Sequence, residues 1–154
     1  MASIHKEIAV EASAEHVWSA IRELGSVHTR LARGFVLDTR LEGDSRLVTF
    51  ANGITVRERI IDVDDRRRRL AYSVVEWLAT HHHATFEVSF DGERRSRIVW
   101  VADLLPHELA PTVDAMMEGG CAAIKQTLEQ TASDQTRLPA RGSAPGTRVA
   151  AHVG

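Results

Sequence analysis

The chain has 154 residues, of which 44% are hydrophobic and 26% charged, a balance typical of one soluble globular domain. Its formal net charge of -2 at pH 7 argues against a general binder of nucleic acid or of anionic membranes. No stretch approaches the ~18 apolar residues that a membrane span needs, so we expect no integral membrane contact.

The N-terminus and the cysteine usage both indicate a cytoplasmic, reducing environment. Residues 1–10 contain His5, Lys6 and Glu7 where the apolar core of a signal peptide would lie. Cys121 is the single cysteine, and it cannot form an internal disulfide.

The composition changes after residue 131. Residues 132–154 contain Pro139, Pro145 and several glycines, and they lack aromatic residues and any apolar period. We therefore expect a folded domain over residues 1–131 and a disordered C-terminal tail over residues 132–154. The tail has more arginine than aspartate, so the domain is more acidic than the whole chain.

The first third of the domain contains apolar residues at the two-residue spacing of a strand and then at the spacing of a helix. Polar and apolar residues alternate over residues 4–12, which predicts a half-buried strand. Ser13 is placed to cap a following helix, in which apolar residues recur at helical spacing from Val17 until Gly25 ends it. A short second helix is expected at residues 26–33.

Residues 35–104 contain only strand-like segments separated by turn signals. The signals are Glu42-Gly43-Asp44, Asn52-Gly53, Asp64-Asp65 and Asp91-Gly92. Asn, Asp and Gly tolerate the positive φ of tight hairpins, so the segment predicts a meander of about six antiparallel strands.

A helix of about five turns is expected after Pro111, whose missing N–H costs nothing at a first helical position. Its apolar stripe comprises Val113, Met117, Gly120, Cys121, Ile124 and Leu128. This helix is the one predicted element large enough to cover a face of the sheet.

The order of these elements, with the segment GITVRERIIDVDDR at residues 53–66 and RLAYSVVE at residues 69–76, resembles the polyketide cyclase/dehydrase-type branch of the START-like (SRPBCC) superfamily. The resemblance covers about residues 3–130. It implies an α+β helix-grip fold, in which a curved antiparallel sheet of about seven strands wraps around a long C-terminal helix. Two short helices follow the first strand, and the sheet and helix enclose a pocket for a hydrophobic ligand.

Glu58 is the foremost candidate for function. Strand alternation places Val56, Glu58 and Ile60 on the inner face, with Arg57 and Arg59 on the outer face. A carboxylate inside an apolar cavity must be paired, hydrogen-bonded or protonated. Glu58 therefore either satisfies a loop backbone or an arginine at the pocket rim, or acts in catalysis.

Tyr72, the only tyrosine, is expected to point inward as well. Its hydroxyl needs a partner, which could be Glu58 on the neighbouring strand or a ligand carbonyl. Ordinary packing is the other interpretation. If Tyr72 and Glu58 meet, they could act as acid/base groups in an aldol-type cyclisation or dehydration, the reaction class of enzymatic relatives.

Further wall residues follow from alternation and helical spacing. Phe86, Phe90 and Trp100 are expected on the inner wall, which would otherwise be aliphatic and methionine-lined. Gly119 and Gly120 each cost helix stability, which indicates either space for a ligand or a close approach of the sheet. The expected ligand-binding residues are Val56, Glu58, Ile60, Tyr72, Phe86, Trp100, Met116, Met117, Gly120 and Cys121.

Other polar groups have weaker signals. The run from His81 to His83 has no accompanying ligand at a metal spacing, so we expect a solvated strand start and no metal site, with a pocket-mouth role for His82 as second choice. His28 is expected at the surface or against a ligand. The four arginines of residues 66–69 are expected in a solvated turn, and Cys121 as a buried small residue.

Two functions follow from these expectations, and no cofactor is required for either. The first is binding of a small hydrophobic molecule, such as a lipid, a quinone or a polyketide-like compound. The alternative is a polyketide aromatase/cyclase or dehydratase that uses Glu58 and Tyr72. A protein-interaction module is disfavoured, because the tail has no apolar anchor pattern. The oligomeric state is open between monomer and homodimer.

Overall fold

The structure is a computed structural model that describes residues 2–137. Its order of one strand, two short helices, six strands and a long helix is the predicted order. The elements are β1 (Ala2–Val10), α1 (Ala14–Arg22), the π-helical turn η1 (Val27–Leu31), β2 (Val36–Glu42), β3 (Ser45–Phe50), β4 (Thr55–Asp64), β5 (Arg69–Val75), β6 (His81–Phe90), β7 (Ser96–Leu105), the short 3₁₀ turn η2 (His107–Leu109) and α2 (Ala110–Arg137).

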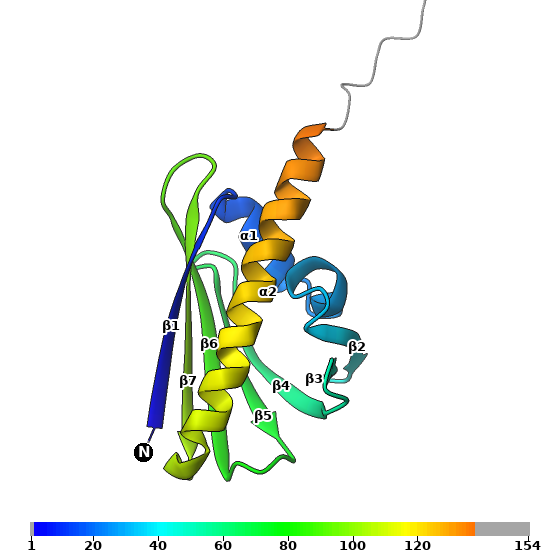
Figure 1. Ribbon diagram of the computed structural model, residues 1–154, viewed down its shortest axis with the longest axis vertical. Coiled ribbons are helices and arrows are strands. Elements are labelled where there is room, and N and C mark those ends of the chain that lie inside the picture. The colour runs from blue at the N-terminus through cyan, green and yellow to red at the C-terminus, as the bar shows by residue number, and fades with distance from the viewer. Residues whose placement is uncertain (1, 138–154) are drawn as a thin grey trace, which may run out of the picture.

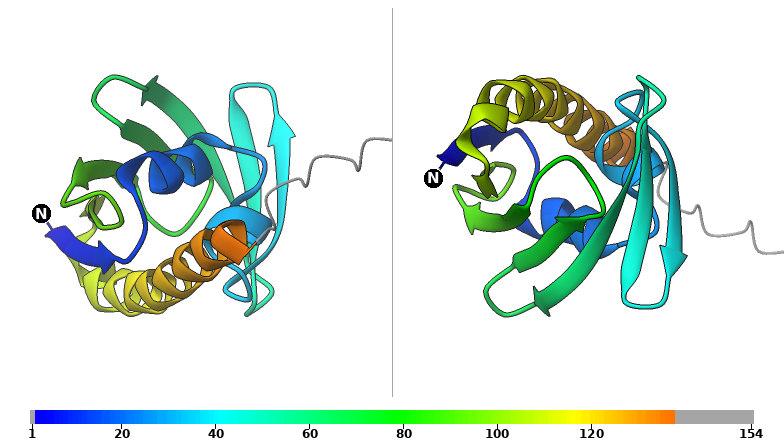
Figure 2. Two further views of the ribbon diagram at one scale, coloured as in Figure 1. Left: turned by 90° about the horizontal axis from the view of Figure 1, so that it is seen from above. Right: turned by 90° about the horizontal axis from the view of Figure 1, so that it is seen from below.

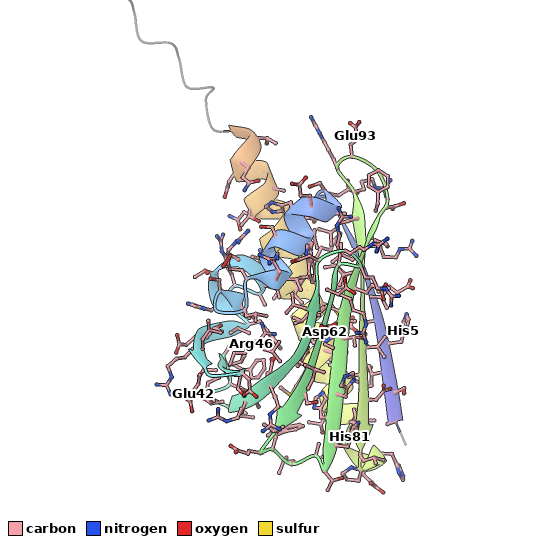
Figure 3. The ribbon with its side chains drawn as sticks, turned by 180° about the vertical axis from the view of Figure 1, so that it is seen from behind. His5, Glu42, Arg46, Asp62, His81 and Glu93 are labelled. Carbon is pink, nitrogen blue, oxygen red and sulfur yellow. The ribbon has the colours of Figure 1, made fainter. Side chains whose placement is uncertain are left out.

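The strands form one antiparallel sheet in the order β1-β7-β6-β5-β4-β3-β2, so the first strand lies beside the last. The sheet curves, and α2 crosses its concave face (Figure 1). Seen along the molecule, the sheet forms a U whose open side is closed by α2, while α1 and η1 lie over one end (Figure 2). This is the expected helix-grip arrangement. Seen from behind, the outer face of the sheet covers α2 (Figure 3).

The start of α1 confirms the predicted cap. Ser13 Oγ accepts a hydrogen bond from the backbone N–H of His16 at 3.1 Å. Further along the helix, Trp18 Nε1 donates to Asp65 at 2.9 Å, and Arg22 pairs with the same carboxylate at 2.7 Å. These contacts fix α1 to the turn between β4 and β5.

Three of the predicted hairpin turns contain a glycine in the left-handed region. Gly43, Gly53 and Gly92 have φ of 61°, 86° and 128°, and they join β2 to β3, β3 to β4 and β6 to β7. The connection from β5 to β6 lacked a turn signal in the sequence. It begins at Glu76, a non-glycine residue with φ of 58°.

The predicted end of the domain after residue 131 lies within α2, which runs to Arg137. Ala132 still packs against the core, so the helix has a reason to continue beyond the composition change. The rest of the predicted tail, residues 138–154, lies outside the described residues. Over residues 2–137, no helix has both the length and the apolar character that crossing a bilayer requires.

The core lies between the concave face of the sheet and α2. Leu70, Ile98 and Leu128 are fully buried there. The expectation that Phe90 belongs to the inner wall is wrong, because its side chain is 68% exposed. Phe90 has the same strand parity as the buried Phe86, but it is the last residue of β6, where the core no longer covers the sheet.

Candidate ligand-binding cavity

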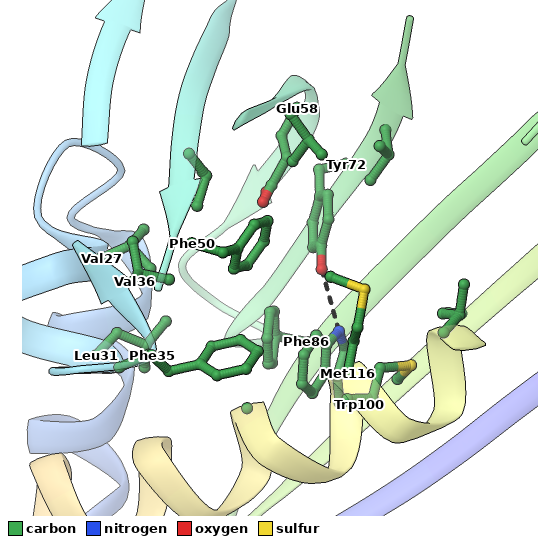
Figure 4. A pocket seen from close by; sticks show the side chains of 18 of the residues that line it. Val27, Leu31, Phe35, Val36, Phe50, Glu58, Tyr72, Phe86, Trp100 and Met116 are labelled. Atoms are coloured by element: carbon green, nitrogen blue, oxygen red, sulfur yellow. Dashed lines mark hydrogen bonds between the residues drawn. The ribbon is translucent and has the colours of Figure 1, made fainter. Parts of the chain in front are cut away.

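An apolar cavity of about 100 Å³ lies between the inner face of the sheet and α2, and η1 closes one side of it (Figure 4). The structure brings eight of the ten expected ligand-binding residues to its wall. They are Val56, Glu58, Tyr72, Phe86, Trp100, Met116, Met117 and Gly120.

Ile60 and Cys121 do not line the cavity. A register shift between Ile60 and Asp62 interrupts the ladder of β4 with β5, and Ile60 packs against the core from beside the cavity. Cys121 follows Gly120 by about 100° around the helix, which turns its thiol away from the cavity. Burial, with the charge of Glu118, raises the pKa of that thiol, as expected for a small packing residue and not for a nucleophile.

Six of the eight aromatic residues line the cavity, which corrects the expectation of a mainly aliphatic and methionine-lined wall. Three of them form a stacked row. The ring centroids of Tyr72 and Phe86 are 6.1 Å apart, and those of Phe86 and Trp100 are 4.7 Å apart. The set is completed by Phe35, Phe50 and Trp77, which were not expected at the wall from the sequence.

Both glycines of α2 face an aromatic ring. A Cβ on Gly120 would lie 3.0 Å from the Trp100 ring, and a Cβ on Gly119 would lie 3.2 Å from the Phe35 ring. The expected close approach of the sheet is found at Gly120, because Trp100 belongs to β7, whereas Phe35 beside Gly119 precedes β2. Because Gly120 also lines the cavity, its missing side chain contributes space there as well.

Glu58 is paired with Arg46, a residue that was not among the expected site residues. The two residues face each other across β3 and β4, and Nε and Nη2 of Arg46 both donate to Oε2 of Glu58 at 3.3 Å. Their side chains are only 2% and 9% exposed. The pairing supports the interpretation that an arginine satisfies Glu58, although this arginine lies inside the wall and not at a rim.

Arg46 also contacts two further groups. Its Nη1 donates to the carbonyl of Leu24 at 3.4 Å, and its guanidinium carbon lies 5.6 Å from the centroid of the Tyr72 ring. The sequence contained a signal for this position, since Arg46 alternates with Val48 and Phe50 on one face of its strand.

Tyr72 is fully buried, and its hydroxyl accepts a hydrogen bond from Nε1 of Trp100 at 3.1 Å (Figure 4). Burial, followed by the negative charge of Glu58, raises the pKa of the phenol. Tyr72 is therefore a neutral hydrogen-bond donor and not a base near neutral pH. Within residues 2–137, no hydrogen bond joins Tyr72 to Glu58, so the contact proposed from the sequence is not formed.

Two hydrogen-bonding functions of this cluster stay unused within the described part of the chain. Oε2 of Glu58 accepts both Arg46 donors, while Oε1 has no donor. The Tyr72 hydroxyl has a donor in Trp100 but no acceptor for its own proton. One acceptor and one donor are thus available to a molecule in the cavity.

The histidines singled out from the sequence differ in their position relative to the cavity. His82 lines the cavity, whereas His81 is exposed at the start of β6. His28 lies outside the cavity wall, with Nδ1 3.1 Å from Oγ1 of Thr39. Among residues 2–137, no group of three His, Cys, Asp or Glu side chains is arranged to hold a metal ion.

Residues 66–68 of the arginine run lie in the turn between β4 and β5, as expected, and Arg69 is the first residue of β5. The backbone N–H groups of Arg66 and Arg67 donate to Oδ1 of Asp64 at 3.0 and 2.9 Å. The side chains of both arginines are exposed to solvent.

Comparison with solved structures finds the same fold in several organisms. An uncharacterized protein from Bacillus thuringiensis aligns with a TM-score of 0.74 at 20% identity, over 82% of this chain and 98% of that one. A START superfamily protein from Mycobacterium smegmatis gives 0.68 at 12% identity, over 86% and 98%. The Zhui aromatase/cyclase from a Streptomyces species gives 0.68 at 17% identity, over 89% and 96%. No curated protein sequence matches this chain.

A curved antiparallel sheet that wraps around a long helix is the fold that this chain shares with the START superfamily protein. The family model described as polyketide cyclase / dehydrase and lipid transport matches residues 1–133, and the chain belongs to this family.

Proposed function

We propose that this protein binds a small, largely apolar molecule in the cavity between α2 and the sheet. The observation that carries the proposal is the wall itself, which is apolar and aromatic apart from a few converging polar side chains. Ligand sites in proteins commonly combine such walls with a small number of placed polar groups.

The size of the cavity favours one ring over a long chain. Its volume is about 100 Å³. An apolar cavity of about 150 Å³ is enough to hold benzene, so a single ring needs only a small side-chain shift here. Met116 is partly exposed and flexible, and it is the wall residue best suited to give way. A lipid or a multi-ring polyketide would require the cavity to open much further.

The polar groups would orient such a ring. Oε1 of Glu58 can accept a hydrogen bond from a ligand hydroxyl, and the Tyr72 hydroxyl can donate to a ligand oxygen. Stacked aromatic side chains beside them offer faces for a planar ligand.

Binding of single-ring aromatics can be tested by calorimetry with phenol as the probe. Gly120→Leu would fill the cavity beside Trp100, and Ala122→Leu on the exposed side of the same helix is its matched control. The proposal expects saturable binding to the wild type and to Ala122→Leu, and loss of binding in Gly120→Leu. Equal binding to all three proteins would place the probe outside the cavity and contradict the proposal.

A second candidate is catalysis of aldol-type cyclisation or dehydration on a polyketide-like substrate. The similarity to the Zhui aromatase/cyclase supports it at the level of the fold. The specific observation in its favour is that Glu58 presents an unused oxygen and Tyr72 an unused proton to one cavity. Glu58 would take a proton from the substrate, and Tyr72 would donate to the oxygen on which charge develops.

Glu58→Gln separates the two candidates on any substrate that is turned over. The amide keeps the shape of the side chain but cannot act as a base. If the protein is an enzyme of this kind, turnover falls by about 10²–10⁴-fold while binding changes little. Unchanged turnover would remove Glu58 from the mechanism.

A further inference from the structure

His82 has an unsatisfied nitrogen at the cavity wall. Its Nδ1 is the one buried side-chain nitrogen or oxygen in the described residues that lacks a hydrogen-bond partner. Burying a polar atom without a partner is unfavourable, and such atoms are rare in folded proteins. His82 also lines the cavity, so a molecule bound there can supply the missing partner once the imidazole ring turns this nitrogen, which has almost no accessible surface, toward it.

The chemistry of this nitrogen is that of a neutral ring. Burial lowers the pKa of His82, and the neighbouring His81 and His83 lower it further. A neutral imidazole carries one N–H donor and one acceptor nitrogen. His82 can therefore pair with either a hydroxyl or a carbonyl oxygen.

The sheet register places His82 in line with Glu58. Glu58 on β4 lies opposite Val74 on β5. The last pairing of β5 with β6 joins Ser73 to His83, so Val74 and His82 directly follow the end of this ladder, and both line the cavity. Glu58 and His82 therefore point from the same inner row of the sheet, with only the apolar Val74 between them.

The spacing of this row limits what fits across it. Two strand spacings separate the backbones of β4 and β6, roughly 10 Å. Hydrogen bonds at both ends therefore need a ligand whose own polar atoms lie several ångströms apart. One ring with oxygen atoms on opposite sides meets this requirement, whereas oxygen atoms on adjacent carbons lie too close together.

We propose that Nδ1 of His82 forms a second polar subsite, and that the cavity takes a single planar ring with one hydroxyl or carbonyl at each end. Glu58 binds one end and His82 the other. The proposal rests on the proposed binding function and narrows its ligand to para-disubstituted aromatic compounds and their quinone counterparts.

Calorimetry with phenol, hydroquinone and catechol tests this assignment. Hydroquinone carries its oxygen atoms at opposite ends of the ring, catechol carries them on adjacent carbons, and phenol has only one. One neutral hydrogen bond corresponds to roughly a 2–10-fold change in affinity, so hydroquinone should bind more tightly than the other two by this factor. The advantage should vanish in His82→Phe and persist in His83→Phe, the adjacent control on the other face of β6.

Imidazole ¹⁵N spectra of the wild-type protein supply a readout that needs no variant. Hydroquinone should move the Nδ1 signal of His82, whereas phenol should leave it in place. If phenol binds but hydroquinone has no advantage, or if the His82 signal does not move, the second subsite is wrong and the binding function stands. If neither phenol nor hydroquinone binds, both proposals fail.

Discussion

Arg46 and Glu58 form a buried ion pair across β3 and β4, with Nε and Nη2 of the guanidinium both 3.3 Å from Oε2 of the carboxylate. Removing two charges from water costs about as much as their attraction returns, so the pair is weak evidence of added stability. Its consequence is local, because it holds a carboxylate at the wall of an otherwise apolar cavity.

Arg46→Met should destabilise the protein by about 3–5 kcal/mol, because it leaves Glu58 buried without its counter-charge. The double variant Arg46→Met with Glu58→Leu should recover much of that loss. Urea unfolding monitored by circular dichroism measures both.

Arg57→Met is the control for this experiment. Arg57 pairs with Glu42 at 3.1 Å on the outer face, where the Glu42 side chain is 52% exposed. Loss of such a pair should cost less than about 1 kcal/mol. Equal effects of the Arg46 and Arg57 variants would contradict the buried pair.

The two glycines of α2 should respond differently to alanine. Each substitution gains about 0.8–1.0 kcal/mol of helix propensity. At Gly119 the partly buried Phe35 can shift away, so we expect a neutral or stabilising effect. At Gly120 the new Cβ would meet Trp100, which is held by its stack on Phe86 and its bond to Tyr72, so we expect destabilisation. Thermal unfolding of the two variants checks the order, and a Gly120→Ala protein as stable as Gly119→Ala would show that Trp100 is free to move.

Ser13→Ala should lower the free energy of unfolding by about 1 kcal/mol, because the His16 N–H loses its cap. Ser13→Asp keeps an acceptor at the cap and should retain most of the stability. Urea unfolding of the pair distinguishes the cap from a general effect of substitution at this site, which would affect both variants alike.

The stability of the protein should depend on pH through His82. Its pKa is lowered from 6.5 in the folded state, so the unfolded chain takes up the proton first as the pH falls. The contribution of neutral His82 is complete above pH 6.5 and is lost as the pH falls toward the folded pKa. Unfolding of the wild type and His82→Phe at pH 7.5 and 5.5 should show the steeper loss in the wild type, and parallel losses would contradict the lowered pKa.

Much of the fold follows from local patterns. Gly43, Gly53 and Gly92 mark turns that a backbone with positive φ requires, and period-two alternation orients β4 and β5 correctly around Glu58 and Tyr72. The alternation of polar and apolar residues does not show where a strand extends beyond the part of the sheet that the core covers. The exposed Phe90 at the end of β6 shows this limit.

The partners of the site residues could not be predicted in the same way. Arg46 has the strand parity of inward residues, but its pairing with Glu58 depends on the register between β3 and β4, which involves the whole sheet. Trp77 reaches the cavity from the connection between β5 and β6, where the sequence carried no turn signal, whereas His82 lies in β6 with the inward parity of Ala84 and Phe86. Contacts between separate elements are set by packing, which a single sequence does not display.

The central claim is that the cavity binds a single aromatic ring, and the methionine methyl groups report on it most directly. The chain has three methionines, of which Met116 and Met117 line the cavity and Met1 is the first residue. In protein labelled with ¹³C at the methionine methyl groups, titration with hydroquinone should shift the Met116 and Met117 signals saturably and leave Met1 in place. Signals of Met116 and Met117 that do not move in the wild type, or that move equally in Gly120→Leu, would contradict the claim.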